Sequence, residues 1–292
     1  MHEALSSLDF LVVSDLFMTP TAALADVVLP SVSYLEFDSI QAPPYSLAVV
    51  TVQQKVAQMG SARSDYETLR DLAGRLGFGG DFWDTEEECL DFLLKPSGIT
   101  FEEFRQIAVL EGTRLYRDHE RNGFPTPSGK VELYSGRLGN WGFDPLPVFT
   151  AEEETGPDMQ KSYPLYFTTW KQASFRHSGG RQISSLRAMH QEPVVTLHPQ
   201  TAEAFGIAAG DMVSVETRRG RIVQKAHIDH DMEPRVIGVD YGWWFPEREK
   251  EGLFGWDEAN VNVLIDDSGP AGKEMGTPAL RAIRCRISKA PE

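Results

Sequence analysis

A short strand–helix–strand pass near the start of the chain constrains the fold more than any other feature. Residues 8–14 (LDFLVVS) form a run rich in Leu, Val and Phe, as in a strand buried on both faces of a parallel sheet. Residues 19–26 (TPTAALAD) open with a threonine cap and a proline, which predicts a short helix, and residues 27–30 (VVLP) predict a second strand. The pattern is typical of one step of a doubly wound α/β sheet.

The other strands of such a sheet are not visible in the sequence. No further alternation of strands and helices follows Pro30, and few residues precede Leu8. A parallel strand needs neighbours on both edges and layers on both faces. We therefore expect a partial, Rossmann-like α/β domain over residues 1–150 whose remaining strands lie outside this sequence. A small self-contained sheet is the alternative.

Three helices, a helical insertion in that domain, are predicted after residue 60, each by a Ser or Thr followed three residues later by a Glu. In such a capping box the two side chains satisfy each other's free amides at the start of a helix. The pairs are Ser64 and Glu67, Thr85 and Glu88, and Thr100 and Glu103. Leucines at helical spacing predict a buried face on the first two helices. They are Leu69, Leu72 and Leu76 on one helix, and Leu90, Leu93 and Leu94 on the other.

The second half of the chain predicts β-structure. An acidic segment, residues 151–159, is interpreted as an exposed linker and as the domain boundary. Short β-rich stretches follow at residues 163–170, 193–198, 211–229, 235–244, 260–267 and 280–288. Their number and their Gly and Pro turns predict a closed barrel of six or more strands over residues 151–292. Gly220, in the turn of the hairpin at residues 211–229, is expected to adopt a positive φ.

Composition argues against several functions. The 28 Lys and Arg against 43 Asp and Glu give a formal charge of −15, which argues against nucleic acid as a partner. No apolar run is long enough for a transmembrane segment. The two cysteines, Cys89 and Cys285, cannot build a zinc or iron–sulfur site alone. The sequence contains no nucleophile elbow, Walker loop or His-Glu-x-x-His motif.

Two stretches carry residues suited to a ligand. Residues 168–182 (TTWKQASFRHSGGRQ) run from a predicted strand into a loop that combines backbone amides, a hydroxyl and several cations. This combination favours a phosphate or pyrophosphate, and a solvated basic loop is the alternative. In residues 241–247 (YGWWFPE), two adjacent tryptophans follow a strand. They predict either an aromatic wall for a flat heterocycle or a part of the barrel core.

Several long motifs, in order along the chain, resemble one known family. Residues 9–36 (DFLVVSDLFMTPTAALADVVLPSVSYLE) resemble the third domain of the dimethyl-sulfoxide-reductase family of molybdenum and tungsten enzymes, and residues 126–135 (TPSGKVELYS) resemble its connecting segment. Residues 163–288 resemble that family's C-terminal dinucleotide-binding barrel, most closely at residues 198–222, 260–267 and 276–287. The resemblance implies a double-psi barrel of the aspartate-decarboxylase-like kind.

The resemblance also implies a cofactor, bis-(molybdopterin guanine dinucleotide) carrying Mo or W. The metal would be held by the cofactor and by a protein ligand in a preceding domain, so we expect no catalytic and no metal-binding residue in this chain. Cofactor contacts are carried over to the positions that match the family motifs. They are Asp15, Thr19, Thr21 and Asp26 in the first domain, and Thr169, Lys171, His177, Ser178, Trp243, Trp244, Asn262 and Arg281 in the barrel. Helix capping is the alternative for these first-domain residues, Thr19 above all, and Trp170 stands where the family often has an arginine.

A family enzyme performs two-electron or oxygen-atom chemistry on a small substrate. By resemblance, this chain would be the part of such an oxidoreductase that positions the pterin cofactor. It would need upstream domains or a partner chain, and an iron–sulfur electron-transfer subunit is a further expected partner. Any iron–sulfur cluster would lie in that subunit or upstream.

Alternatives stay open. The motifs GWWFPE (242–247) and NVNVLIDD (260–267) lean toward the branch of thiosulfate and polysulfide reductases, hydroxytransferases and acetylene-hydratase-like enzymes, which admits a non-redox hydration. A non-catalytic fragment that binds or scaffolds the cofactor is an alternative from another class. The chain is expected to be soluble, in the cytoplasm or the periplasm, with any sorting signal upstream.

Overall fold

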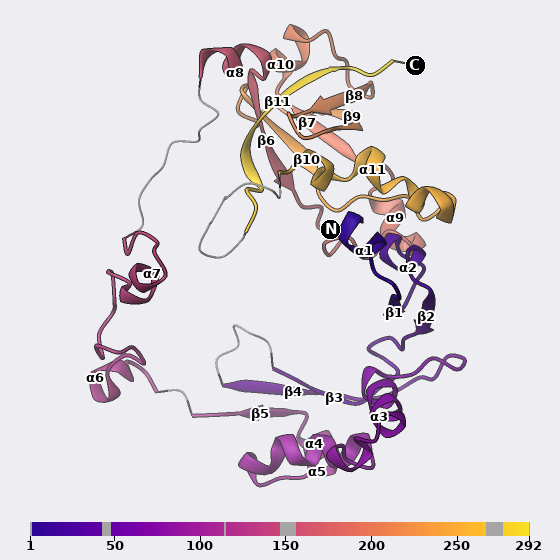
Figure 1. Cartoon of the computed structure of the whole chain (residues 1–292), viewed down its shortest axis with the longest axis vertical. Helices are drawn as coiled ribbons and strands as arrows, with labels where there is room; N and C mark the ends of the chain where they lie inside the picture. The colour runs from indigo at the N-terminus through magenta and orange to yellow at the C-terminus, as the bar shows by residue number, and fades with distance from the viewer. Residues whose placement is uncertain (1, 43–47, 114, 147–155, 267–276, 292) are drawn as a thin grey trace. The chain divides into compact units, whose positions relative to one another are not determined.

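The chain forms two compact units, Met1–Val131 and Glu132–Glu292. The computed structural model describes residues 2–42, 48–113, 115–146, 156–266 and 277–291 (Figure 1). A domain boundary at residues 151–159 stays a prediction, because most of that segment lies outside the described residues. Among the described residues, no helix has the length and apolar character needed to cross a membrane.

The first unit contains two small sheets and a group of helices. Its elements are α1 (His2–Ser6), β1 (Val12–Asp15), α2 (Pro20–Ala23), β2 (Val27–Pro30), β3 (Ser39–Gln41), β4 (Val49–Gln53), α3 (Asp65–Arg75), η1 (Gly79–Asp81), α4 (Glu86–Leu94), η2 (Lys95–Ser97), α5 (Phe101–Ile107), β5 (Val109–Glu111) and α6 (His119–Asn122). β1 and β2 pair in parallel on either side of α2 in sequence, so the predicted strand–helix–strand pass is confirmed. Among the described residues, that sheet has these two strands alone. Apolar side chains on and beside it, such as Phe10, Val12 and Val27, are exposed.

The second sheet of the first unit is antiparallel, in the order β3–β4–β5. Helices α4 and α5 pack against it (Figure 1). Four apolar side chains, Leu90, Leu94, Phe101 and Phe104, are buried in this layer. This small cluster is the apolar core of the unit.

The capping boxes form with one difference. Ser64 and Thr100 each make the full reciprocal box at the start of α3 and α5. Thr85 accepts the amide of Glu88, but the Glu88 carboxylate accepts the amide of Asp84 instead of the cap amide. All three predicted helices are therefore confirmed, and one of the three caps is only half of a box.

The buried leucine face is confirmed for α4 in part and is wrong for α3. Leu90 and Leu94 are buried, whereas the predicted leucines of α3, with Leu93 of α4, are exposed. Those α3 residues are Leu69, Leu72 and Leu76. The reason is that α3 packs mainly on η1 and buries only Ala73 within the described part of the unit.

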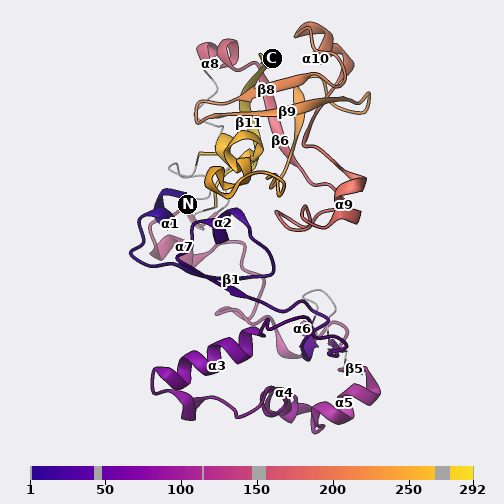
Figure 2. The ribbon, with the colours of Figure 1, turned by 90° about the vertical axis from the view of Figure 1, so that its right-hand side faces the viewer.

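The second unit is built on a closed barrel (Figures 1 and 2). Its elements are α7 (Gly136–Asn140), α8 (Pro157–Ser162), β6 (Leu165–Trp170), α9 (Ser184–Met189), β7 (Val194–Leu197), α10 (Pro199–Ala204), β8 (Met212–Glu216), β9 (Arg221–Ile228), β10 (Val236–Asp240), η3 (Lys250–Gly255), α11 (Trp256–Ala259), η4 (Val261–Leu264) and β11 (Arg281–Lys289). The barrel closes in the order β10–β6–β11–β8–β9–β7. Two pairs, β10 with β6 and β7 with β9, are parallel, and the other four are antiparallel.

The barrel confirms the predicted fold class, a mixed α/β chain with a closed six-stranded barrel. Its mixture of parallel and antiparallel pairs fits the double-psi description. Side chains alternate between inside and outside along each strand, so the interior fills with aliphatic and aromatic groups. Phe167, Val195, Val213, Val215 and Ile237 are among those that are fully buried.

Two expectations for this unit are wrong. Within the described residues 260–266 no strand forms, because η4 occupies most of this segment and buries Val261 and Leu264 at helical spacing. The hairpin of β8 and β9 forms, but Gly220 does not have a positive φ. A Cβ atom at Gly220 would lie 2.6 Å from the Val263 carbonyl oxygen. Glycine is therefore required there by the close approach of η4.

Candidate functional site

Three chain segments meet at one end of the barrel. β6 and β10 are parallel neighbours, so their last residues, Trp170 and Asp240, lie side by side. β11 runs antiparallel to β6, and its first residue, Arg281, pairs with Thr168. Within this unit, α9 and α11 lie at this end of the barrel, and α8 and α10 lie at the other (Figures 1 and 2). The loops that follow β6 and β10 therefore share one end of a rigid scaffold, where binding residues often lie.

The loop after β6 contains a tight turn at residues 176–180, here called the His177 turn. The Gly179 amide donates to the Arg176 carbonyl over 2.9 Å, and His177 and Gly180 have φ of +52° and +93°. The side chains of His177 and Ser178 are exposed. Within the described residues, the amides of His177, Ser178 and Gly180 donate to no acceptor. Free amides around residues of positive φ form concave anion sites, so this turn suits a phosphate group.

Arg181 contacts the turn from the protein interior. Its side chain is buried, with 3% exposed, and its guanidinium carbon lies 4.6 Å and 4.9 Å from the ring centroids of Phe175 and Trp243. Nη1 donates to the His177 carbonyl over 2.8 Å, and Nη2 donates to the Tyr241 carbonyl over 2.7 Å. One guanidinium thus joins the loop after β6 to the segment after β10.

Asp240 places a buried negative charge in the same region. Its carboxylate accepts hydrogen bonds from Gln172 Nε2 at 2.7 Å and from the Val194 amide at 2.9 Å, and lies 2.6 Å from His190 Nε2. Burial lowers the pKa of Arg181 to about 10, and Asp240 opposes that shift. Arg181 is therefore still charged at neutral pH. The two opposite charges and their hydrogen bonds fix the base of both loops.

Trp243 and Trp244 are both buried, which favours the core alternative over an exposed aromatic wall. Trp243 makes edge contacts with Phe175 and His190. Trp244 donates its indole N–H to the Ser178 carbonyl over 2.8 Å. The pair therefore supports the His177 turn from behind, and stacking of either ring on a ligand stays a prediction.

Asn262 lies in η4 with its side chain exposed. Its amide donates to Oδ1 of the buried Asn260, and Asn260 Nδ2 donates to the Trp243 carbonyl, each over 3.0 Å. Asn260 therefore anchors η4 to the segment after β10. The sequence did not single out Asn260, although it comes two residues before the predicted contact Asn262.

The remaining barrel candidates lie on β6, β11 and the loop after β6. Thr169 is half-buried in β6 beside Val239, and Arg281 is exposed at the start of β11. Lys171 is exposed, with Nζ 5.8 Å from the centre of the Tyr241 ring. The structure thus brings six exposed or half-buried candidates to this end of the barrel. They are Thr169, Lys171, His177, Ser178, Asn262 and Arg281.

The first-unit candidates make local hydrogen bonds. Thr19 caps α2 by accepting the Ala22 amide and donates its hydroxyl to Asp15. The Asp26 carboxylate accepts the Leu11 amide over 2.8 Å. Thr21 is exposed in α2. These contacts match the capping alternative, and a cofactor role for the four residues stays a prediction.

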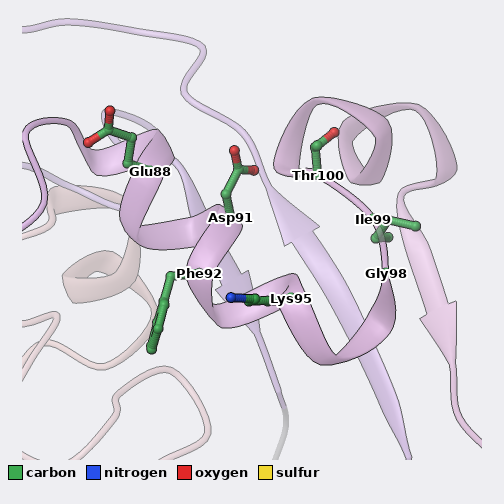
Figure 3. Close-up of a pocket in the computed structure, with 7 residues that line it drawn as sticks. All are labelled: Glu88, Asp91, Phe92, Lys95, Gly98, Ile99 and Thr100. Atoms are coloured by element: carbon green, nitrogen blue, oxygen red, sulfur yellow. The ribbon is translucent and has the colours of Figure 1, made fainter.

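A separate hollow of about 430 Å³ lies in the first unit between α4 and the turn that follows it (Figure 3). It is lined by Glu88, Asp91, Phe92, Lys95, Gly98, Ile99 and Thr100. Its two carboxylates accept hydrogen bonds from the backbone, Asp91 from the Phe101 amide and Glu88 from the Asp84 amide. The hollow contains none of the predicted site residues.

Sequence reasoning missed the buried polar network that holds the barrel site. Arg181 was noticed only as one cation of the loop, and Asp240, His190 and Gln172 were not noticed. One signal was available, because Asp240 ends an otherwise apolar strand (VIGVD), and a charged residue there needs partners. Its partners lie 46–68 residues away in sequence and could not be read from spacing.

The residues at this end of the barrel fit the pyrophosphate of a dinucleotide. The His177 turn offers free amides, a hydroxyl and an imidazole, with Lys171 as a nearby exposed cation. Three buried donors in the region, Arg181 Nε, Arg187 Nη1 and Trp243 Nε1, and one buried acceptor, Gln182 Oε1, have no partner within the described residues. This is a donor-rich environment, as an anionic ligand requires.

The fold and the site define a dinucleotide-binding barrel, and comparison with known families agrees. Residues 165–280 match the family described as molydopterin dinucleotide binding domain, and residues 1–75 match the family described as molybdopterin oxidoreductase. The chain therefore carries molybdopterin oxidoreductase and molydopterin dinucleotide-binding domains and is homologous to members of the dimethyl-sulfoxide-reductase family.

Among known proteins, an acetylene hydratase from Syntrophotalea acetylenica is 36% identical over 292 residues and is matched by 96% of this chain. The F420-dependent formate dehydrogenase subunit alpha of Methanocaldococcus jannaschii is 31% identical, and dimethyl sulfoxide reductase DmsA of Escherichia coli is 29% identical. They are matched by 91% and 93% of this chain. The solved structure of acetylene hydratase from Pelobacter acetylenicus superposes with a TM-score of 0.92 at 32% identity over 99% of this chain.

The chain spans only part of each of these proteins. It covers 40% of the S. acetylenica hydratase, 37% of the formate dehydrogenase subunit and of DmsA, and 41% of the hydratase in the solved structure. The homology therefore extends to the cofactor-binding part, and the reaction of a complete enzyme is a separate question.

Proposed function

We propose that this chain holds a molybdopterin guanine dinucleotide at the end of its barrel where the loops after β6 and β10 meet. The observation that carries the proposal is the His177 turn, whose amides of His177, Ser178 and Gly180 have no acceptor within the described residues. In this assignment the pyrophosphate accepts hydrogen bonds from those amides and from the Ser178 hydroxyl. Lys171 adds a positive charge.

The other exposed candidates are assigned to the polar edges of the cofactor. Asn262 and Arg281 offer an amide and a guanidinium, and Thr169 offers a hydroxyl at the end of β6. Hydrogen bonds from such groups orient a bound cofactor and tune its electronic properties. Asp15, Thr19, Thr21 and Asp26 are proposed as contacts of the first unit, in addition to their capping bonds. Trp243 and Trp244 hold the loop from inside.

The cofactor, when bound, supplies the metal, Mo or W, at which a small substrate reacts. The chain's own residues bind and orient it and exclude water from it. In this proposal the rest of the catalytic machinery comes from further domains or a partner chain. Any iron–sulfur cluster belongs to those parts or to an electron-transfer subunit.

For the complete enzyme we propose two-electron or oxygen-atom chemistry, with a non-redox hydration as the second candidate. The second candidate is favoured by one observation, since the acetylene hydratases are 36% and 32% identical and the structural match reaches a TM-score of 0.92. The two candidates separate in one assay on the enzyme as isolated. Hydration consumes acetylene with neither an electron donor nor an electron acceptor, whereas two-electron chemistry requires one of them, such as a reduced or an oxidised dye.

The cofactor proposal is tested on the protein purified from its native source. Mo and W are measured by elemental analysis, and guanine nucleotide is measured after acid release. Metal together with guanine nucleotide is the expected result. A stable protein with neither would contradict the proposal and leave the scaffolding alternative.

A matched pair of variants assigns the nucleotide to the barrel site. We expect Lys171→Met to weaken binding of guanosine diphosphate to the chain by about 10-fold, because a charge-assisted contact contributes roughly 1–2 kcal/mol. Lys225→Met is the control, since Lys225 is a half-buried lysine of β9 whose amine pairs with Glu192. Equal affinities for both variants, measured by calorimetry, would place the nucleotide elsewhere.

A further inference from the structure

The backbone of the His177 turn is held in an unfavourable conformation. His177 has φ of +52°, a region that L residues with a side chain rarely adopt. Such a residue costs about 1–2 kcal/mol and persists only where neighbouring groups enforce it. The turn therefore needs stabilising contacts from residues outside it.

The hold comes from two contacts on the His177 carbonyl. Arg181 Nη1 donates to this oxygen over 2.8 Å. On the other side, the turn lies against Gly242, where a Cβ atom would come within 2.9 Å of the same oxygen. The second arm of the guanidinium donates to the carbonyl of Tyr241, the residue before Gly242. Arg181 thus fastens the turn directly to the segment on which it packs.

Arg187 provides an internal comparison. Its guanidinium carbon lies 5.0 Å from the centre of the Trp243 ring, almost the same distance as that of Arg181. Its hydrogen bond goes to the exposed carboxylate of Glu247, however, and not to a backbone carbonyl. Both arginines therefore share the indole, and only Arg181 bonds to the turn.

We propose that Arg181 is a positioning residue that locks the His177 turn in the conformation presenting its free amides. Its geometry separates it from a simple core cation, because both of its hydrogen bonds go to carbonyls at the meeting point of two loops. Charge-assisted bonds of this kind are strong in a buried site. The ligand of the turn rests on the proposed function, whereas the locking itself does not.

The first arm of the test needs no ligand. The Gly179 amide donates to Arg176 only while the turn is closed, so its hydrogen exchange, followed by NMR on the full chain, reports opening of the turn. We expect Arg181→Met to accelerate this exchange by at least ~10-fold and Arg187→Met to change it less than ~2-fold. Arg181→Lys keeps the charge but loses the fork, and is expected to behave like Arg181→Met.

A double-mutant cycle distinguishes locking from general loss of packing. Glycine adopts positive φ without strain, so in a His177→Gly background the turn needs no lock. There, Arg181→Met is expected to change Gly179 exchange by less than ~3-fold. An equal effect of Arg181→Met in both backgrounds, or an equal effect of Arg187→Met, would overturn the positioning role.

The second arm uses guanosine diphosphate as the probe on the same variants. Arg181→Met is expected to weaken its binding by at least ~10-fold and Arg187→Met by less than ~2-fold, because a turn that opens must be reordered on binding. If the unaltered chain binds no guanosine diphosphate, the proposed function fails, and the exchange arm still decides the lock. If exchange responds but affinity does not, the turn is locked but is not the nucleotide site.

Discussion

The two units of this chain differ in how completely they bury their apolar side chains. The barrel has no open strand edge in its ring and surrounds a large cluster of fully buried side chains. Among its described residues, the first unit has a two-stranded parallel sheet with exposed apolar side chains and one small apolar cluster of four buried residues. Parallel sheets are ordinarily covered on both faces. The described barrel therefore covers its own apolar core, whereas the parallel sheet of the first unit leaves apolar side chains uncovered.

The sharpest way to break this comparison is to truncate one phenylalanine in each unit. Phe167 is fully buried in the barrel and Phe10 is largely exposed beside β1. We expect Phe167→Ala to lower the free energy of unfolding by about 3–5 kcal/mol, since it removes buried apolar area and leaves a cavity. Phe10→Ala is expected to change it by less than about 0.5 kcal/mol. Urea unfolding followed by circular dichroism measures both, and similar losses would refute the contrast.

A pair of glycines sharpens the comparison at the level of backbone packing. In the barrel, Gly220→Ala forces a Cβ atom to within 2.6 Å of the Val263 carbonyl oxygen. We expect a loss of about 1–3 kcal/mol from this overpacking. In α3 of the first unit, a Cβ at Gly74 meets nothing within 4 Å. Gly74→Ala should therefore stabilise the helix by roughly 0.5–1 kcal/mol, and the two variants should shift the melting temperature in opposite directions.

The smallest effect concerns a helix cap of the first unit and its dependence on pH. Hydrogen bonds from the Thr100 amide and then from its hydroxyl hold the pKa of Glu103 below its ordinary value of 4.5. Because the folded pKa is lower than the unfolded one, this contribution is present above pH ~4.5 and is lost as the pH falls through the folded pKa. In a plot of melting temperature against pH, Glu103→Gln should therefore show a smaller decrease at acid pH than the parent chain. Melting temperatures of the two proteins, measured between about pH 3 and pH 7, check this, and an equal dependence on pH would contradict it.

Local features of the fold were predictable from the sequence. The strand–helix–strand pass and the barrel strands follow from apolar runs and turn residues, and the helix starts follow from Ser64, Thr85 and Thr100. Contacts between elements that are far apart in the sequence could not be predicted. Leu69 and its neighbours have helical spacing, but periodicity does not say whether another element covers a face. Residues 260–267 are rich in apolar residues, as in a strand, yet Val261–Leu264 form η4 against a hairpin turn.

The exposed candidate residues could be chosen from the sequence, whereas the buried residues that support them could not, and contact of the candidates with a ligand stays a prediction. Resemblance pointed to His177, Ser178 and Asn262, and the structure places all three, exposed, on the loops at one end of the barrel. The roles of Arg181 and Asp240 depend on carbonyls and side chains from several strands, which only the closed barrel brings together. The sequence predicted the tryptophan pair either as an aromatic wall or as a part of the barrel core, and its burial favours the core alternative.

The contact between the β8–β9 turn and η4 has a consequence for how this protein can vary. The Thr217 hydroxyl donates to the Leu264 carbonyl, and Gly220 leaves room for the Val263 carbonyl. Asn262 lies directly before Val263 and Leu264. Its position is therefore set by the β8–β9 turn, which lies more than 40 residues earlier in the chain. A one-residue insertion in that turn would displace Asn262 without touching its own segment. Grafting either segment from a relative should therefore succeed only when the other is exchanged with it.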